Sequence, residues 1–167
     1  TCIFSNSLLP TITGKSTYPV DITGIRGSAA ALVAACITAD QTSPALCIVP
    51  SESQAFILRN DLTFFSSLHL FHYPAHEVPP YTPLSPDQQT VSNRIAALYK
   101  VITTKPPYIV VASVESLLRK IVPAENITRM AELVINGEET NPEELKIHLS
   151  VAGYDQMHLV QNAGEFS

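Results

Sequence analysis

The stretch that decides the fold is Tyr108-Ile109-Val110-Val111-Ala112, the most strand-like run in the chain. Its β-branched and aromatic residues favour a short, buried β-strand. Ser113 follows as a helix N-cap, and the sequence predicts a short helix from Val114 to about Lys120. A buried strand that leads directly into a helix is typical of a parallel βαβ unit.

The segments upstream of this stretch repeat the same alternation. Strands are predicted at 20–23, at the buried run 45–49 and at 67–71, and helices at 28–38, 52–65 and 87–103. Ser51 is a good N-cap for the second helix, with Gln54 at its third position. Val91, Ile95 and Leu98 share one face of the third helix. We therefore expect an α/β fold, a RecA-like or P-loop-type parallel sheet with flanking helices.

The character of the sequence changes near Pro123, and a second, small α+β domain is expected to begin there. A strand is predicted at 132–135, a helix capped by Asn141 that stops at Gly153, and a strand at 158–160. The predicted domains are therefore residues 1–122 and residues 123–167.

The junction between the first strand and the first helix lies where a nucleotide-binding domain has its phosphate loop. That loop requires Gly-x-x-x-x-Gly-Lys-[Ser/Thr], in which the lysine neutralises phosphate and the hydroxyl holds Mg²⁺. The frame here is Gly24-Ile25-Arg26-Gly27-Ser28-Ala29-Ala30-Ala31, with alanine in the second glycine, lysine and hydroxyl positions. The sequence therefore does not predict a working ATP site, and helix packing explains the alanines better. Weak anion binding at Gly24, Gly27 and Ser28 stays open, because free N–H groups at a helix start attract anions.

The bulk composition excludes several classes of protein. The 167 residues are 46% hydrophobic and carry 10 Lys+Arg against 15 Asp+Glu, a net charge of −5. Such a chain is a poor stand-alone nucleic-acid binder, since it lacks a run of cations. No apolar stretch is long enough to cross a membrane. The three cysteines show no disulfide or zinc spacing, Cys36 and Cys47 resemble small buried hydrophobes, and a cytoplasmic location is expected.

Other candidate sites have simpler explanations. His72 and His76 are four residues apart, but Pro74 between them breaks the helix that would align them on a metal, and no third ligand is obvious. The sequence contains no Gly-x-Ser-x-Gly elbow for a serine nucleophile. We expect no catalytic residue, no metal and no cofactor in this chain.

Several segments, in order, resemble the N-terminal, UvrB-like region of bacterial transcription-repair coupling factors (the Mfd family). The most specific is residues 73–86, Tyr-Pro-Ala-His-Glu-Val-Pro-Pro-Tyr-Thr-Pro-Leu-Ser-Pro, although His76 and Thr82 replace the family's usual Trp and Asp. Ser92-Asn93-Arg94-Ile95-Ala96-Ala97-Leu98-Tyr99, Ala152-Gly153-Tyr154 and Gly164-Glu165-Phe166 are similar to later family segments.

The resemblance implies a non-catalytic module that helps to recruit UvrA and holds the protein in an autoinhibited state by contacts within it. The parent protein would be an ATP-dependent DNA translocase that displaces stalled RNA polymerase, with the ATP and Mg²⁺ sites in a downstream motor. It also implies that Glu165 and Phe166 lie at the UvrA-docking surface, with the docking arginines beyond Ser167.

Two alternatives remain. A UvrB-type helicase or ATPase domain fragment would require nucleotide binding despite Ala30. A non-catalytic α/β domain outside DNA repair would require the ordered family segments to be coincidental.

Overall fold

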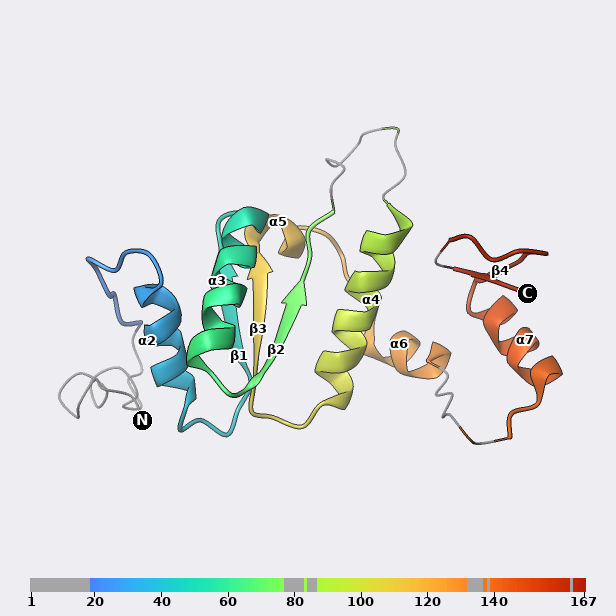
Figure 1. Ribbon diagram of the computed structural model, residues 1–167, viewed down its shortest axis with the longest axis horizontal. Coiled ribbons are helices and arrows are strands. Elements are labelled where there is room, and N and C mark those ends of the chain that lie inside the picture. Colours follow the sequence, from blue (N-terminus) through green and yellow to red (C-terminus); the bar gives the residue numbers. More distant parts are fainter. Residues whose placement is uncertain (1–18, 77–82, 84–86, 132–136, 138, 163) are drawn as a thin grey trace.

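A central parallel sheet organises the larger part of the chain (Figure 1). The computed structural model describes residues 19–76, 83, 87–131, 137, 139–162 and 164–167. In these ranges β1 (Ala45–Val49), β2 (His69–Tyr73) and β3 (Tyr108–Ser113) form one sheet in the spatial order β1-β3-β2, with all strands parallel. The expected α/β class is confirmed.

The stretch singled out by its sequence is the central strand of this sheet. Val111 of β3 is paired with Cys47 of β1 on one side and with His72 of β2 on the other. Because β3 has a neighbour at both edges, nearly all of its side chains are buried, and Ile109 and Val111 are fully covered. This double burial explains why its sequence is apolar without interruption.

Side-chain caps begin the helices that follow the strands. The α3 helix (Glu52–Phe65) starts at Ser51, whose Oγ accepts from the amide of Gln54 at 3.4 Å. The α4 helix (Gln88–Thr103) starts at Asp87, and the short α5 helix (Val114–Leu117) starts at Ser113; both side chains accept an amide N–H three residues on. These helix starts confirm the predictions made for 52, 87 and 114.

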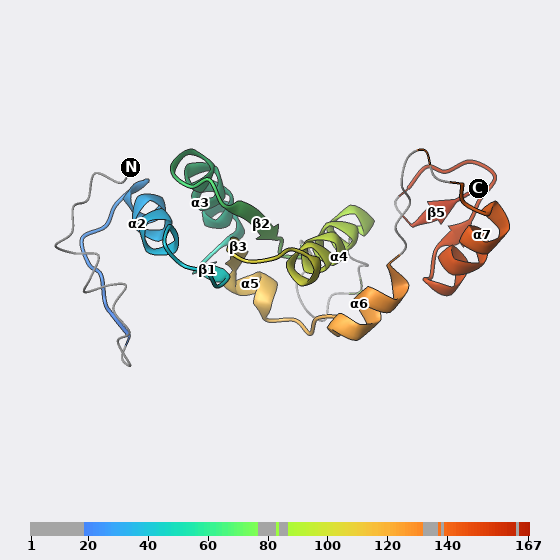
Figure 2. The same cartoon turned by 90° about the horizontal axis from the view of Figure 1, so that it is seen from below.

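Helices cover the two faces of the sheet differently. On one face α2 (Ala29–Thr38) and α3 pack over β1 and β3, where Ala31, Ala35 and Ala55 let the helices approach closely. On the other face α4 packs through Ala97 against Tyr73 and Ala112. Figure 2 shows α3 and α5 on opposite sides of the sheet.

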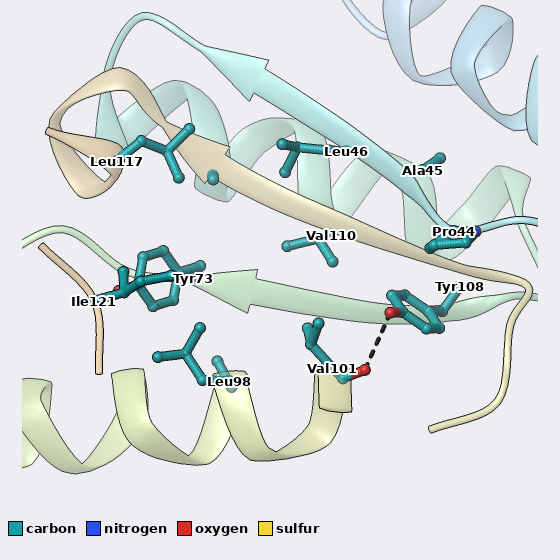
Figure 3. A pocket seen from close by; sticks show the side chains of 12 residues that line it. Pro44, Ala45, Leu46, Tyr73, Leu98, Val101, Tyr108, Val110, Leu117 and Ile121 are labelled. Atoms are coloured by element: carbon teal, nitrogen blue, oxygen red, sulfur yellow. Dashed lines mark hydrogen bonds between the residues drawn. The ribbon is translucent and has the colours of Figure 1, made fainter. Parts of the chain in front are cut away.

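The second face is open above β1. Leu46 and Ile48 are 55% and 54% exposed, so the prediction of a strand buried on both faces is wrong for β1. Beside Leu46 an apolar cavity of about 300 Å³ extends between the strands, α4 and Leu117 (Figure 3). Tyr108 closes one end of it by donating its hydroxyl to the carbonyl of Val101 at 3.1 Å. Only the α2–α3 face of β1 is therefore packed.

Two other predicted strands are not formed. Residues 20–23 form no strand with any described part of the chain, and Val20 and Ile22 are more than two-fifths exposed. Residues 158–160 form a bend, because the short strands that pair are β4 (Asp155–Gln156) and β5 (Glu165–Phe166). The strand expected at 132–135 lies outside the described residues.

The cysteines differ from expectation in one respect. Cys47 is a free thiol on β1, and burial raises its pKa, as expected of a small hydrophobe. Cys36 on α2 is buried but is disulfide-bonded, so the prediction of an unmodified buried thiol is wrong at this position.

The described residues of the C-terminal part form two helices and two short parallel strands. The α6 helix (Ala124–Met130) was not expected and packs against α4. The α7 helix (Pro142–Val151) begins at Asn141, whose Oδ1 accepts from the amide of Glu143 at 3.1 Å, and it ends before Gly153, which has a φ of 91°. Both ends of α7 were therefore predicted correctly.

Candidate functional site

The phosphate-loop frame lies on the surface at the start of α2. Gly24 and Gly27 both have positive φ angles, 79° and 55°, which glycine adopts without strain. Ser28 is exposed at the N-cap position, and its side chain makes no capping bond. No strand precedes this loop in the described residues, so it is not held at the end of a sheet strand as a phosphate loop would be.

The three alanines of this frame have different environments. Ala29 and Ala30 are exposed, whereas Ala31 has no exposed surface and packs in the core with Ala35 and Leu62. The residue in the Mg²⁺-ligand position is therefore a core residue, and the lysine position carries only a methyl group. The lysine and hydroxyl positions of the frame therefore lack the cation and the Mg²⁺ ligand that phosphoryl transfer uses there.

A polar cluster lies at the carboxyl edge of the sheet, where α/β proteins commonly bind ligands. Its acidic member is Glu52, in the first turn of α3. Glu52 Oε2 accepts from the Ala75 amide at 3.1 Å and from the Ser113 hydroxyl at 2.9 Å, and Oε1 lies 2.7 Å from His72 Nε2. One carboxylate thus joins α3, the ends of β2 and β3, and Ala75, which follows β2.

The basic member of the cluster is Arg94 of α4, which is only 5% exposed. Its guanidinium donates to the carbonyls of Pro74 and Ser116 and to the Tyr73 hydroxyl, and it stacks 4.1 Å from the centre of the Tyr73 ring. Every one of these partners is uncharged. The guanidinium therefore positions the end of β2 and the α5 turn, and it is occupied by the fold rather than presented to a ligand.

The two histidines near this cluster do not form a metal centre. His76 is partly buried, and burial lowers its pKa first, with the positive charges of Arg94 and Arg119 lowering it further. His72 is directed to Glu52. In the ranges that the structure describes, no three His, Cys, Asp or Glu side chains are grouped so that they could hold a metal ion.

Glu165 and Phe166 form β5 and have structural contacts of their own. Glu165 accepts from the amides of Gln161 and Asn162 at 2.8 and 3.0 Å and from the Asn162 side chain at 2.8 Å, and these bonds, the side-chain bond first, hold its pKa below the ordinary value. Phe166 is 7% exposed. The carboxylate closes the preceding loop and the ring is in the core of the small unit, so neither is a freely displayed contact residue.

Sequence reasoning missed the Glu52–Arg94 cluster. One signal was present: Arg94 lies on the same helical face as Val91, Ile95 and Leu98, and an arginine within an apolar stripe indicates a buried guanidinium with polar partners. Glu52 gave no such signal, because an acidic residue in a first helical turn is explained by the helix dipole alone.

These features define the class of the protein: an α/β fold built on a small parallel sheet with flanking helices. No protein-family model matches the chain. The chain is 33% identical to a transcription-repair-coupling factor of Myxococcus xanthus over 152 residues, 86% of this chain. It is 25% identical to the Escherichia coli protein of the same name over 143 residues, also 86% of this chain. The chain belongs to the transcription-repair coupling factor family.

The alignment also defines how much of such a protein is present. The chain spans 13% of the length of the Myxococcus protein and 12% of the Escherichia coli protein. A third relative, from Haemophilus influenzae, is 25% identical over 72% of this chain. No helix among the described residues is both long enough and apolar enough to span a membrane.

Proposed function

We propose that this chain is a non-catalytic N-terminal module of a transcription-repair coupling factor that contributes to UvrA recruitment and to autoinhibition within the parent protein. The observation that carries the proposal is the start of α2, where the lysine position is Ala30 and the hydroxyl position is the buried Ala31. The resemblance to UvrB supports a RecA-like ancestry in which residues 1–122 have lost their nucleotide site. Residues 123–167 would begin the UvrA-docking domain.

The parent protein would be an ATP-dependent DNA translocase of the cytoplasm, whose downstream motor binds ATP and Mg²⁺. That motor and the adjoining domains would contact DNA and the stalled RNA polymerase. The present chain would contribute protein–protein contacts alone. This division of labour fits its net charge of −5, which disfavours binding to the phosphate backbone.

The nucleotide half of the proposal is tested by calorimetry with Mg-ATP. We expect no heat of binding in the micromolar range, because Ala30 leaves the lysine position without a cation and Gly24, Gly27 and Ser28 offer backbone N–H groups. Micromolar affinity for Mg-ATP would instead support the UvrB-type ATPase alternative. Weak binding of inorganic phosphate alone is compatible with the proposal, since helix N–H groups can hold an anion.

The docking half is tested by comparing this chain with a longer one that continues through the next few dozen residues of the parent. In the proposed interface Glu165 and Phe166 shape the docking surface from within, and arginines beyond Ser167 make the charged contacts. Removing such arginines leaves partner carboxylates unpaired, so the present chain should retain UvrA poorly in pull-downs and the longer chain well. Equal retention at matched concentrations would show that the argument is wrong.

A further inference from the structure

The feature that carries a further inference is a groove between α3 and α4. Its volume is about 520 Å³. Phe56 and Arg59 of α3 form one wall, Asn93 and Lys100 of α4 form the other, and residues of β2 form the floor. In Figure 1 α4 lies to the right of β2, and α3 lies to its left with β3 between them. The groove belongs to the three-stranded unit and not to residues 123–167, so it is separate from the UvrA-docking proposal.

The groove lies along the free edge of the sheet. β2 pairs with β3 on one side, and in the described part of the chain no strand pairs with its other side. Leu70 and Phe71, which project to opposite faces of a strand, both contribute to the lining, so the groove borders the strand edge and not one face. An unpaired edge offers a row of backbone donors and acceptors that an extended chain can complete.

The charges at the rim are of one sign. Arg59 and Lys100 lie on opposite walls, and the residues that the structure describes give neither of them a carboxylate within ion-pair distance. Two unpaired cations at one groove are notable in a chain with only 10 basic residues against 15 acidic ones. Phe56, on the same wall as Arg59, is 56% exposed, so the groove combines an apolar wall with a cationic rim.

We propose that this groove is a docking site for an extended, acidic peptide segment of a partner protein, which adds as a strand to the edge of β2. The peptide backbone pairs with β2, alternate apolar side chains pack on Phe56 at one face and on Phe71 at the other, and acidic side chains reach Arg59 and Lys100. Strand addition of this kind takes affinity from main-chain hydrogen bonds and specificity from alternate side chains. The five residues of β2 accommodate a contact about 17 Å long.

A peptide fits these observations better than a nucleic acid. Nucleic-acid binding depends on several cations that follow a phosphate backbone, and this groove has two on facing walls. Recognition of a nucleic acid by charge alone does not use a strand edge. An exposed strand edge is the defining feature of β-strand addition by a peptide.

The test uses a displayed library of random nine-residue peptides, selected on the 167-residue chain. Peptides enriched in acidic residues over the library frequency are expected. Their affinity is then measured by fluorescence anisotropy for the original chain, for Arg59→Glu/Lys100→Glu, and for Lys105→Glu/Lys120→Glu. The last pair makes the same change in net charge at exposed positions outside the groove. Circular dichroism checks that all three chains are folded.

The Arg59→Glu/Lys100→Glu variant should bind the peptide about tenfold more weakly, because two attractions become repulsions. The Lys105→Glu/Lys120→Glu variant should bind it almost as well as the original chain. Methylating alternate backbone nitrogens of the peptide should also weaken binding, since it removes the donors that pair with β2. Absence of acidic enrichment, equal loss in both variants, or unchanged binding of the methylated peptide would overturn the proposal. Complete displacement of the peptide by a short oligothymidylate would overturn it in favour of a nucleic-acid site.

Discussion

Arg94 is the residue that connects the end of β2 to α5. Its guanidinium is buried, and it joins the end of β2 to the turn that begins α5. A buried cation without a carboxylate partner is tolerated only where its donors are satisfied, and here two carbonyls and a hydroxyl do so. Arg94 therefore fixes the position of Pro74, which lies twenty residues before it in the sequence.

Replacing Arg94 by alanine should lower the free energy of unfolding by about 2–4 kcal/mol, because two buried carbonyls and the Tyr73 hydroxyl lose their donor. Arg94→Lys should recover only part of this, since an ammonium group cannot make the same forked contacts. Urea denaturation measures both. The matched control is Arg129→Ala, an exposed arginine bonded to Asn126, for which a change below about 0.5 kcal/mol is expected. Equal effects at the two positions would contradict the assigned role.

At the scale of elements, β1 has one packed face and one open face. Cys47 and Val49 pack under α2 and α3, while Leu46 and Ile48 point to the uncovered side. The double variant Leu46→Thr/Ile48→Thr should keep the strand, because threonine is β-branched, and should change the free energy of unfolding by less than about 1 kcal/mol. It should also reduce binding of a hydrophobic dye.

The control for β1 is Val111→Thr on β3, which is fully buried and should cost about 2 kcal/mol by placing a hydroxyl in the core. Guanidinium denaturation and dye fluorescence are read together. A large loss of stability in the β1 variant would mean that its outer face is packed in solution.

The elements differ in how far their sequences determine them. The strands β1, β2 and β3 and the starts of α3, α4 and α7 were predictable, because burial periodicity and capping side chains are local signals. The prediction of a strand at 20–23 was wrong, because apolar residues alone do not show whether a neighbouring strand is present to pair with them. β4 and β5 were missed because each has only two residues, too few for an alternating pattern, and they are joined by backbone hydrogen bonds that any side chain permits.

Glu165 makes the small parallel pair of β4 and β5 sensitive to acid. Its three hydrogen bonds hold the folded-state pKa below the ordinary value of glutamate, so the charged form stabilises the fold. That stabilisation is complete above the unfolded-state pKa and is lost as the pH falls through the folded-state pKa. We therefore expect the hydrogen bonds from the Gln161 and Asn162 amides to Glu165 to weaken in acid, as the pH falls through the folded-state pKa of Glu165.

The measurement is an NMR titration of the Glu165 carboxyl carbon in the folded chain and in urea. The folded midpoint should be the lower of the two. Glu165→Gln should abolish the change in the Gln161 and Asn162 amide signals over this pH range. Identical midpoints in the folded and unfolded chains would remove the basis for the prediction.

For the whole molecule, the net charge determines how strongly the isolated chain binds DNA. With a net charge of −5 and cations dispersed over the surface, the isolated chain should bind duplex DNA weakly, and raising the salt should abolish what binding there is. Gel shifts at physiological salt, with intact and damaged duplexes, provide the check. Tight retention that depends on damage would contradict this and favour the UvrB-type alternative.

The contacts of Glu52 also affect the rates at which the whole molecule folds and unfolds. Its carboxylate binds a residue 23 positions away and another 61 positions away, so these bonds can form only after β1, β2 and β3 have assembled. Contacts between positions so distant in sequence are made late on a folding route. Removing the charge by Glu52→Gln should therefore accelerate unfolding far more than it slows folding. The carboxylate then acts as a kinetic lock, which prolongs the life of the folded state without helping the chain to reach it.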